Sequence, residues 1–207
     1  MNKYLTAIAA MALATLSIEA HAGFIVNEYN NVTTIAALNT AVTTTAPSST
    51  TSAQVIDYKF GNGSAGAFSI NNPFPNNNVP STNFGLNITA NFVINAAGNY
   101  FFRTFSDDGV QLYIDNISVL ANVNDHAGTT NTSSAVTLSA GNHTLDLRFV
   151  QHGGNADLEL SSGAGANGIF TLFGSQNGLQ TVPEPAPLAL LALGLIGVFA
   201  SRRKTTK

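Results

Sequence analysis

The sequence contains no cysteine and no tryptophan, and only 9% of its 207 residues are charged. The absence of cysteine excludes a disulfide framework, a cysteine-ligated zinc site and a thiol nucleophile. Soluble domains typically carry about 25% charged residues. The low charge and the mean hydropathy of +0.15 are therefore not typical of a cytosolic domain. A formal net charge of −3 gives no basic surface for nucleic acid, so no nucleic-acid partner is expected.

The N-terminus has the pattern of a secretory signal peptide. Lys3 precedes an apolar stretch over residues 5–18, and Ala20 and Ala22 supply the small residues of a signal-peptidase site. We therefore expect residues 1–22 to be removed and the mature chain to begin at Gly23. A membrane helix that stays in place is the alternative, which the shortness of the apolar stretch disfavours.

A second sorting device lies at the C-terminus, over residues 182–207. It has three parts, which are a Pro-Glu-Pro motif (Pro183, Glu184, Pro185), an apolar run over residues 186–200 and a basic end with Arg202 and Arg203. As a helix the run would span roughly 22 Å, which is short for a hydrocarbon core of about 30 Å, so its membrane insertion is expected to be transient. The arrangement resembles the PEP-CTERM sorting signal, which implies processing by an exosortase during export from Gram-negative cells. A plain C-terminal membrane anchor is the alternative.

The body between these segments, residues 23–181, is acidic. Three of the eight basic residues and nine of the eleven acidic residues lie there, which gives a formal charge of −6. This length suits one domain with a single core. The expected surface is rich in asparagine, threonine, serine and glycine instead of the usual lysine and glutamate. This composition is common in secreted proteins.

Apolar and polar residues alternate along the body with a period of two, as in half-buried β-strands. The apolar positions form four sets, which are Leu86, Ile88, Ala90, Phe92 and Ile94; Val110, Leu112 and Ile114; Leu145, Leu147 and Phe149; and Ala156, Leu158 and Leu160. Turn residues such as Gly109 and Gly154 separate the sets. The pattern predicts an all-β fold, an antiparallel β-sandwich with one face of each sheet buried. A short N-terminal helix is expected over residues 33–42, and long loops over residues 43–52 and 71–83.

Several motifs follow one another in a familiar order over residues 86–160. They are Gly-Asn-Tyr-Phe-Phe at 98–102, Ser-Asp-Asp-Gly-Val-Gln-Leu-Tyr-Ile-Asp at 106–115 and Leu-Ser-Ala-Gly-Asn-His at 138–143. This order resembles the protective-antigen fourteen-kilodalton (PA-fourteen) domain family, which implies a lectin-like β-sandwich. The sequence departs from the family at Asn116, where glycine often follows Ile-Asp, and in its diverged N-terminal third.

Asp107 and Asp108 are the leading site candidates, because two adjacent carboxylates at a turn need a cation or strong donors. In sugar-binding relatives such as the fungal flocculin-type adhesins, a cis-linked aspartate pair and an asparagine from a later loop hold Ca²⁺, which also coordinates sugar hydroxyls. The resemblance implies that Asp107, Asp108 and Asn155 would hold Ca²⁺ here. Asp157 and Glu159 would add backbone carbonyl ligands.

These positions also have structural interpretations. Ser-Asp-Asp-Gly is a good hairpin turn, in which aspartate accepts bonds from backbone amides. His152 adjoins the proposed site, where it would contact a sugar or simply lie at the surface. Asp115 is interpreted as a turn residue or an accessory ligand, and His143 as a satisfied, half-buried side chain rather than a metal ligand. Asp125 and His126 are interpreted as surface residues.

No catalytic motif is present, since the sequence has no Gly-x-Ser-x-Gly elbow, no His-Glu-x-x-His and no phosphate loop. Asp107 and Asp157 would be one carboxylate pair able to cleave glycosides, but acids on adjacent loops of a small lectin-like sandwich more often bind than cut. We therefore expect a non-enzymatic protein, exported through the inner membrane to the cell surface or exopolysaccharide matrix of a Gram-negative bacterium. It would bind a glycan through Ca²⁺. A structural biofilm protein with no small ligand is the alternative.

Overall fold

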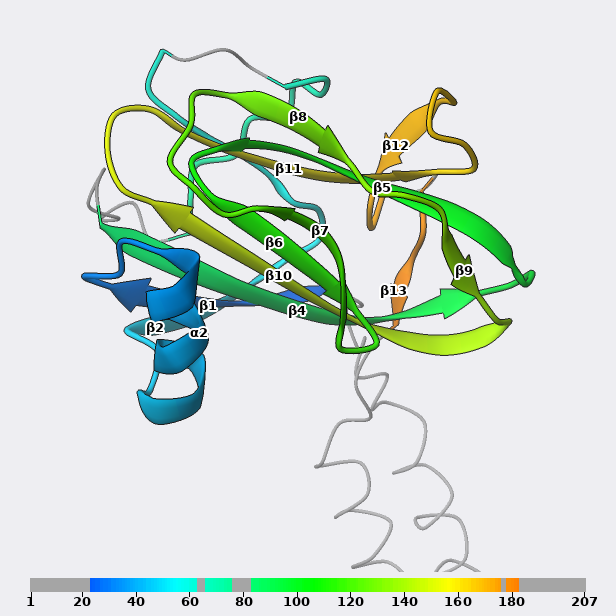
Figure 1. The fold of residues 1–207 in the computed structure, drawn as a ribbon, viewed down its shortest axis with the longest axis horizontal. Coiled ribbons are helices and arrows are strands. Elements are labelled where there is room, and N and C mark those ends of the chain that lie inside the picture. Colours follow the sequence, from blue (N-terminus) through cyan, green and yellow to red (C-terminus); the bar gives the residue numbers. More distant parts are fainter. Residues whose placement is uncertain (1–22, 63–65, 76–82, 176–177, 183–207) are drawn as a thin grey trace, which may run out of the picture. The chain divides into compact units, whose positions relative to one another are not determined.

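A computed structural model describes residues 23–62, 66–75, 83–175 and 178–182. These residues form thirteen β-strands and one α-helix (Figure 1). The elements are β1 (Phe24–Asn30), α2 (Ile35–Thr44), β2 (Ser49–Ala53), β3 (Asp57–Phe60), β4 (Phe84–Ile94), β5 (Gly98–Asp107), β6 (Val110–Ile114), β7 (Ile117–Asn122), β8 (Thr129–Thr132), β9 (Val136–Leu138), β10 (Gly141–Gln151), β11 (Ala156–Gly163), β12 (Phe170–Leu172) and β13 (Thr181–Val182). The predicted signal peptide, Pro-Glu-Pro motif and C-terminal apolar helix lie outside the described residues.

The strands form two antiparallel sheets. The first has the strand order β2-β1-β4-β10-β6-β7, and β13 also pairs with β4. The second has the order β12-β11-β5-β8, with β3 also paired to β11 and β9 to β5. Figure 1 shows the two sheets as separate layers, with α2 outside the first. The all-β antiparallel sandwich with one short helix is thus confirmed.

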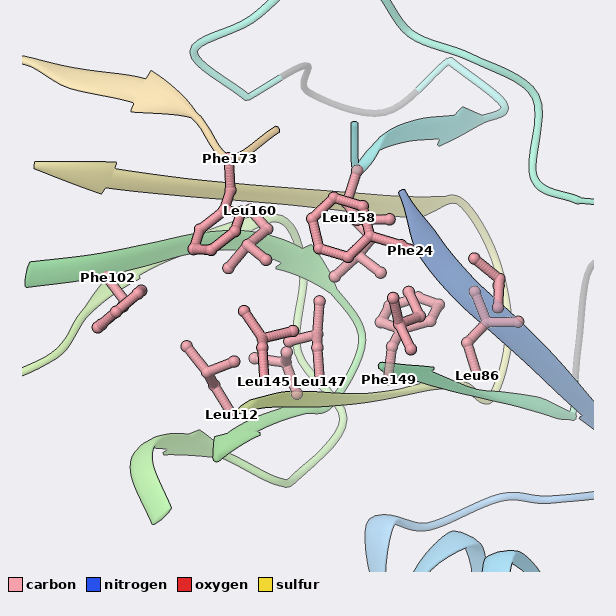
Figure 2. Packing of buried hydrophobic residues seen from close by; sticks show 14 of the residues in the cluster. Phe24, Leu86, Phe102, Leu112, Leu145, Leu147, Phe149, Leu158, Leu160 and Phe173 are labelled. Atoms are coloured by element: carbon pink, nitrogen blue, oxygen red, sulfur yellow. The ribbon is translucent and has the colours of Figure 1, made fainter. Parts of the chain in front are cut away.

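The core lies between the two sheets, where the inward-facing positions of the strands meet. Figure 2 shows Leu145 and Leu147 of β10 pointing toward Leu158 and Leu160 of β11. All four side chains are at most 2% exposed. Burial of a side chain of this size contributes roughly 1.5–3 kcal/mol to folding. The buried faces of β4, β6, β10 and β11 are those that the alternation predicts, and of the fourteen residues in those sets only Ala90 is partly exposed.

Helix α2 begins where a capping side chain is available. The Thr34 hydroxyl oxygen accepts a bond from the Ala37 backbone amide at 3.1 Å, which satisfies one of the free amides of the first turn. Ile35 and Leu38 are buried in a small second core with Tyr29 and Val150, on the outer side of the first sheet. The predicted helix is therefore confirmed, two residues later than expected at each end.

Two expectations about the surface were wrong. Residues 49–52, expected in a loop, belong to the edge strand β2. This strand pairs with β1, and its polar side chains alternate between the two faces. The outer face of β11, expected to face water, is also buried, since Asp157, Glu159 and Ser161 are each at most 4% exposed. Residues 66–70 cover part of this face. No helix among the described residues is long and apolar enough to span a membrane.

Candidate functional site

Three loops meet at the carboxylate of Asp108, in the turn between β5 and β6. Asp108 is 6% exposed. One of its oxygens accepts a bond from the His126 backbone amide at 3.1 Å, in the connection between β7 and β8. The other accepts bonds from the backbone amides of His152 at 3.0 Å and Gly153 at 3.4 Å, in the connection between β10 and β11. The Asp108 side chain therefore fixes these loops relative to one another.

A buried glutamine shapes the loop between β10 and β11. The Gln151 side-chain amide donates to the backbone carbonyls of Gly153 at 2.8 Å and Asn155 at 2.6 Å. Gln151 is fully buried. Its polar side chain thus bends the loop back on itself, while Asp108 holds its outer edge. The sequence carries no clear signal for this role, because glutamine at the end of a strand usually faces water.

Asp107 is the more accessible of the two adjacent aspartates. The peptide bond between Asp107 and Asp108 is cis. Burial and the neighbouring Asp108 charge raise the pKa of Asp107, against the lowering effects of the Gly128 amide and His126. Asp107 is the register partner of Asp157 across the pairing of β5 and β11. Its half-buried carboxylate also contacts the connection between β7 and β8, since it accepts a bond from the Gly128 amide.

Asn155 and His152 flank the aspartate pair on the third loop. Asn155 is exposed, and its side-chain oxygen lies against the backbone of Gly61, where a β-carbon would overlap it. His152 has its ring turned to Asp125, with Nδ1 2.7 Å from that carboxylate. The hydrogen bond that the His152 ring donates to the Asp125 carboxylate raises the pKa of His152. The His152 side chain is 52% exposed and so remains accessible to a ligand.

The Asp157 carboxylate has Lys59 as its charged partner. It is buried on the outer face of β11, with one oxygen 3.7 Å from the Lys59 ammonium. The other oxygen has no hydrogen-bond partner in the described part of the chain. Burial, together with the charges of Asp107 and Glu159, raises the pKa of Asp157 to about 6 although Lys59 opposes the shift. Asp157 therefore carries a poorly compensated charge at neutral pH.

The predicted calcium ligands fit the ion in chemical type. Asp107, Asp108 and Asn155 offer carboxylate and amide oxygens, which calcium prefers. Residues 23–62, 66–75, 83–175 and 178–182 contain no group of three or more acidic or histidine side chains that could share one ion. Asp107, Asp108 and Asp157 therefore do not form such a group. Any ion at these loops would depend on the aspartate pair and on amide or backbone oxygens.

The other candidates from the sequence have structural roles. Asp115 and Asn116 both have positive φ, at 51° and 64°, and close the turn between β6 and β7. The Asp115 carboxylate contacts His143 Nδ1 at 2.6 Å and accepts a bond from the Thr144 amide at 2.9 Å. His143 Nε2 lies 3.0 Å from the carbonyl of Ser139. The interpretations of Asp115 as a turn residue and of His143 as a satisfied side chain are in line with these contacts.

His126 was interpreted as a surface residue, but its backbone belongs to the site. Its amide binds Asp108, and its Nδ1 lies 2.9 Å from the Ala127 carbonyl. Its Nε2 is buried without a hydrogen-bond partner among the described residues. The contact joins residues 18 positions apart, so it could not be seen in a local pattern.

Two sequence families match the chain. The PA14 domain matches residues 36–166, which is more than half of the chain. The chain belongs to the PA14 domain family. The PEP-CTERM protein-sorting motif matches residues 181–204. This second match identifies a PEP-CTERM tail and indicates an exported protein. No curated protein matches the chain significantly.

Solved structures support the PA14 fold. A PA14 sugar-binding domain from an RTX adhesin is 19% identical with a TM-score of 0.61, over 79% of this chain and 98% of that one. The PA14 domain of the antifreeze protein MpAFP is 18% identical with a TM-score of 0.59, over 73% and 86%. The epithelial adhesin 9 A domain from Candida glabrata, in complex with Galβ1-3GlcNAc, is 13% identical with a TM-score of 0.52, over 82% and 94%. At these identities the likeness concerns the fold alone.

Proposed function

We propose that this PA14 protein is an exported, non-enzymatic carbohydrate-binding module. The observation that carries the proposal is the convergence of three loops on Asp108, which leaves Asp107, His152 and Asn155 around one end of the sandwich. Loops fixed on a rigid sandwich are a common place for binding residues. The proposal is supported by two solved relatives, one named as a sugar-binding domain and one in complex with a disaccharide.

Calcium is the proposed cofactor. Asp107, Asp108 and Asn155 would hold it, and the bound ion would offer open coordination positions to sugar hydroxyls. The ion would also favour the ionised form of Asp107, whose pKa is raised by burial and by the neighbouring Asp108 charge. The exposed ring of His152 would contact the sugar beside it. Asp157 would contribute its backbone carbonyl, while its carboxylate lies 3.7 Å from the Lys59 ammonium.

For export, we propose that the chain is divided into three parts. Residues 1–22 would be the signal peptide, residues 23–181 the PA14 domain and residues 182–207 the sorting tail. The tail would insert transiently into the inner membrane, where an exosortase would process it. The domain would then reach the outer surface or the exopolysaccharide matrix of a Gram-negative cell, with a glycan as its partner.

A second candidate function is a structural matrix protein with no small ligand. The specific observation in its favour is that both carboxylate oxygens of Asp108 already accept backbone bonds. In that case the aspartate pair would serve only to hold the loops together. The two candidates differ in their response to calcium.

A calcium titration of the purified protein tests the proposal. Calorimetry should show binding with a dissociation constant of about 10⁻⁴ to 10⁻³ M, as in extracellular calcium modules. The Asp107→Asn variant should lose this binding, while Asp125→Asn, a matched change of an exposed acid on a neighbouring loop, should keep it. Glycan-array binding should disappear with a chelator. If the natural protein releases or absorbs no heat on titration with calcium, the structural function is favoured. The same holds if Asp107→Asn gives the same binding heat as the natural protein.

A further inference from the structure

A cavity on the outer face of the second sheet is separate from the aspartate loops. Its volume is about 280 Å³. Strands β5 and β11 form its floor, and β8, β12 and residues 67–68 its sides. Neither Asp107 nor Asp108 lines it, and neither His152 nor Asn155 does. The molecule therefore has a second concave surface that the proposed sugar site does not use.

Arg103, on β5, lines this cavity. It is one of three lysine or arginine residues between residues 23 and 182. The other two have carboxylate partners, since Lys59 lies 3.7 Å from Asp157 and Arg148 lies 2.8 Å from Asp146. Within the described ranges, Arg103 has no carboxylate partner. Arg103 therefore forms no ion pair there, although the Glu159 carboxylate lines the same cavity.

Neutral groups hold the Arg103 side chain in position. Its Nε donates to the Thr132 hydroxyl at 3.0 Å, and its Nη2 donates to the Ala166 carbonyl at 3.2 Å. The guanidinium carbon lies 3.6 Å from the centre of the Phe170 ring. An aromatic face orients a guanidinium without neutralising it. The side chain is therefore held in place, and the remaining N–H groups of Arg103 can donate hydrogen bonds to an anionic acceptor.

The rest of the lining combines aromatic rings with polar groups, among them the Glu159 carboxylate. Phe68, Phe105 and Phe170 contribute aromatic rings, and Ser161 a hydroxyl. The Glu159 carboxylate accepts bonds from the backbone amides of Ala67 at 2.9 Å and Phe68 at 3.0 Å. Glu159 thereby fixes one wall of the cavity. Aromatic rings suit the C–H faces of a sugar ring, and the polar atoms suit its hydroxyls.

We propose that this cavity binds one sugar unit that carries a carboxylate, a hexuronate, and that Arg103 pairs with that carboxylate. The volume lies just below the range of about 300–1,000 Å³ for pockets of drug-sized ligands, so a single ring is the appropriate size. Arginine and carboxylate form paired, charge-assisted hydrogen bonds. The site requires no calcium and does not depend on the proposed function of the aspartate loops.

Binding of D-glucuronate to the purified full-length protein in EDTA tests this proposal. D-glucose is the matched control, because it has the same ring without the carboxylate. Calorimetry or ligand-observed NMR should show glucuronate binding at least about tenfold more tightly than glucose. The Arg103→Gln variant should weaken glucuronate binding by a similar factor, and Asp107→Asn should leave it unchanged.

A second variant keeps the result interpretable if Arg103→Gln unfolds. Phe170→Leu removes the ring under the guanidinium but keeps an apolar side chain, and should also weaken binding. Equal binding of glucose and glucuronate, or no binding of either, would overturn the proposal. Binding that Asp107→Asn abolishes would place glucuronate at the aspartate loops and overturn it as well. Because EDTA is present, failure here leaves the calcium-dependent function untouched.

Discussion

The Asp108 carboxylate accepts a hydrogen bond from the His152 backbone amide at 3.0 Å, across 44 positions of sequence. The bond joins the turn after β5 to the loop after β10, in different sheets. A carboxylate that accepts backbone amides while buried is a structural anchor as well as a possible ligand. Asp107, its neighbour, accepts a bond from the Gly128 amide in one other loop only, within the described residues, and is the better probe of binding.

The first prediction separates these roles. Asp108→Ala leaves the amides of His126, His152 and Gly153 without their acceptor, and should reduce the free energy of unfolding by roughly 2–4 kcal/mol. Asp107→Asn should change it by less than about 1 kcal/mol in EDTA. Urea unfolding followed by circular dichroism measures both. Equal losses in the two variants would contradict the anchoring role of Asp108.

The second prediction concerns the pH dependence at His143. The hydrogen bond to Asp115 raises the pKa of His143 above 6.5, and this side chain is only 8% exposed. A histidine whose pKa is higher in the folded than in the unfolded state stabilises the protein at pH values below its unfolded-state pKa. This stabilisation is lost as the pH rises through the folded-state pKa. The stability advantage of the natural protein over His143→Gln should therefore be larger at pH 6 than at pH 9. His152→Gln, which changes a histidine 52% exposed, is the control and should show a much weaker trend.

The third prediction concerns Asp157, whose pKa burial raises from 3.8 to about 6. Ionisation of Asp157 is therefore less favourable in the folded than in the unfolded protein. The part of the free energy of unfolding that is present below pH 3.8 is lost as the pH rises through 6. Asp157→Asn cannot ionise. From pH 4 to pH 7 in EDTA, this variant should gain roughly 2–3 kcal/mol relative to the natural protein. Urea midpoints across this range measure the difference. A constant difference would show that Asp157 has an ordinary pKa.

The fourth prediction compares two glycines with similar backbone angles. Gly174 and Gly154 have φ of 86° and 81°. A β-carbon at Gly174 would overlap the Gln54 carbonyl oxygen, whereas one at Gly154 would meet nothing within 4 Å. Gly154→Ala should cost about 1–2 kcal/mol from backbone strain alone, and Gly174→Ala roughly 1–3 kcal/mol more. Thermal unfolding of both variants tests this, and equal melting temperatures would be the contrary result.

The sequence determined much of the core, because a period of two depends only on which residues are apolar. The buried faces of β4, β6, β10 and β11 follow from it, apart from the partly exposed Ala90. Short strands such as β8 and β12 have no such alternation, and they form because a neighbouring strand in the sheet offers unpaired backbone groups. Tertiary pairing therefore decided these elements.

The candidate site divides in the same way. Its aspartate pair could be named from a local motif, since a turn is coded by adjacent residues, and Asn155 from the family resemblance. The Asp108 bonds, the role of Gln151, the pairing of Asp157 with Lys59 and the cavity beside Arg103 all join distant parts of the chain. No local pattern encodes such contacts, because they depend on the register between strands and on which loops lie side by side. The sequence alone determined which residues carry charge, and only the tertiary structure decided which of those charges are compensated.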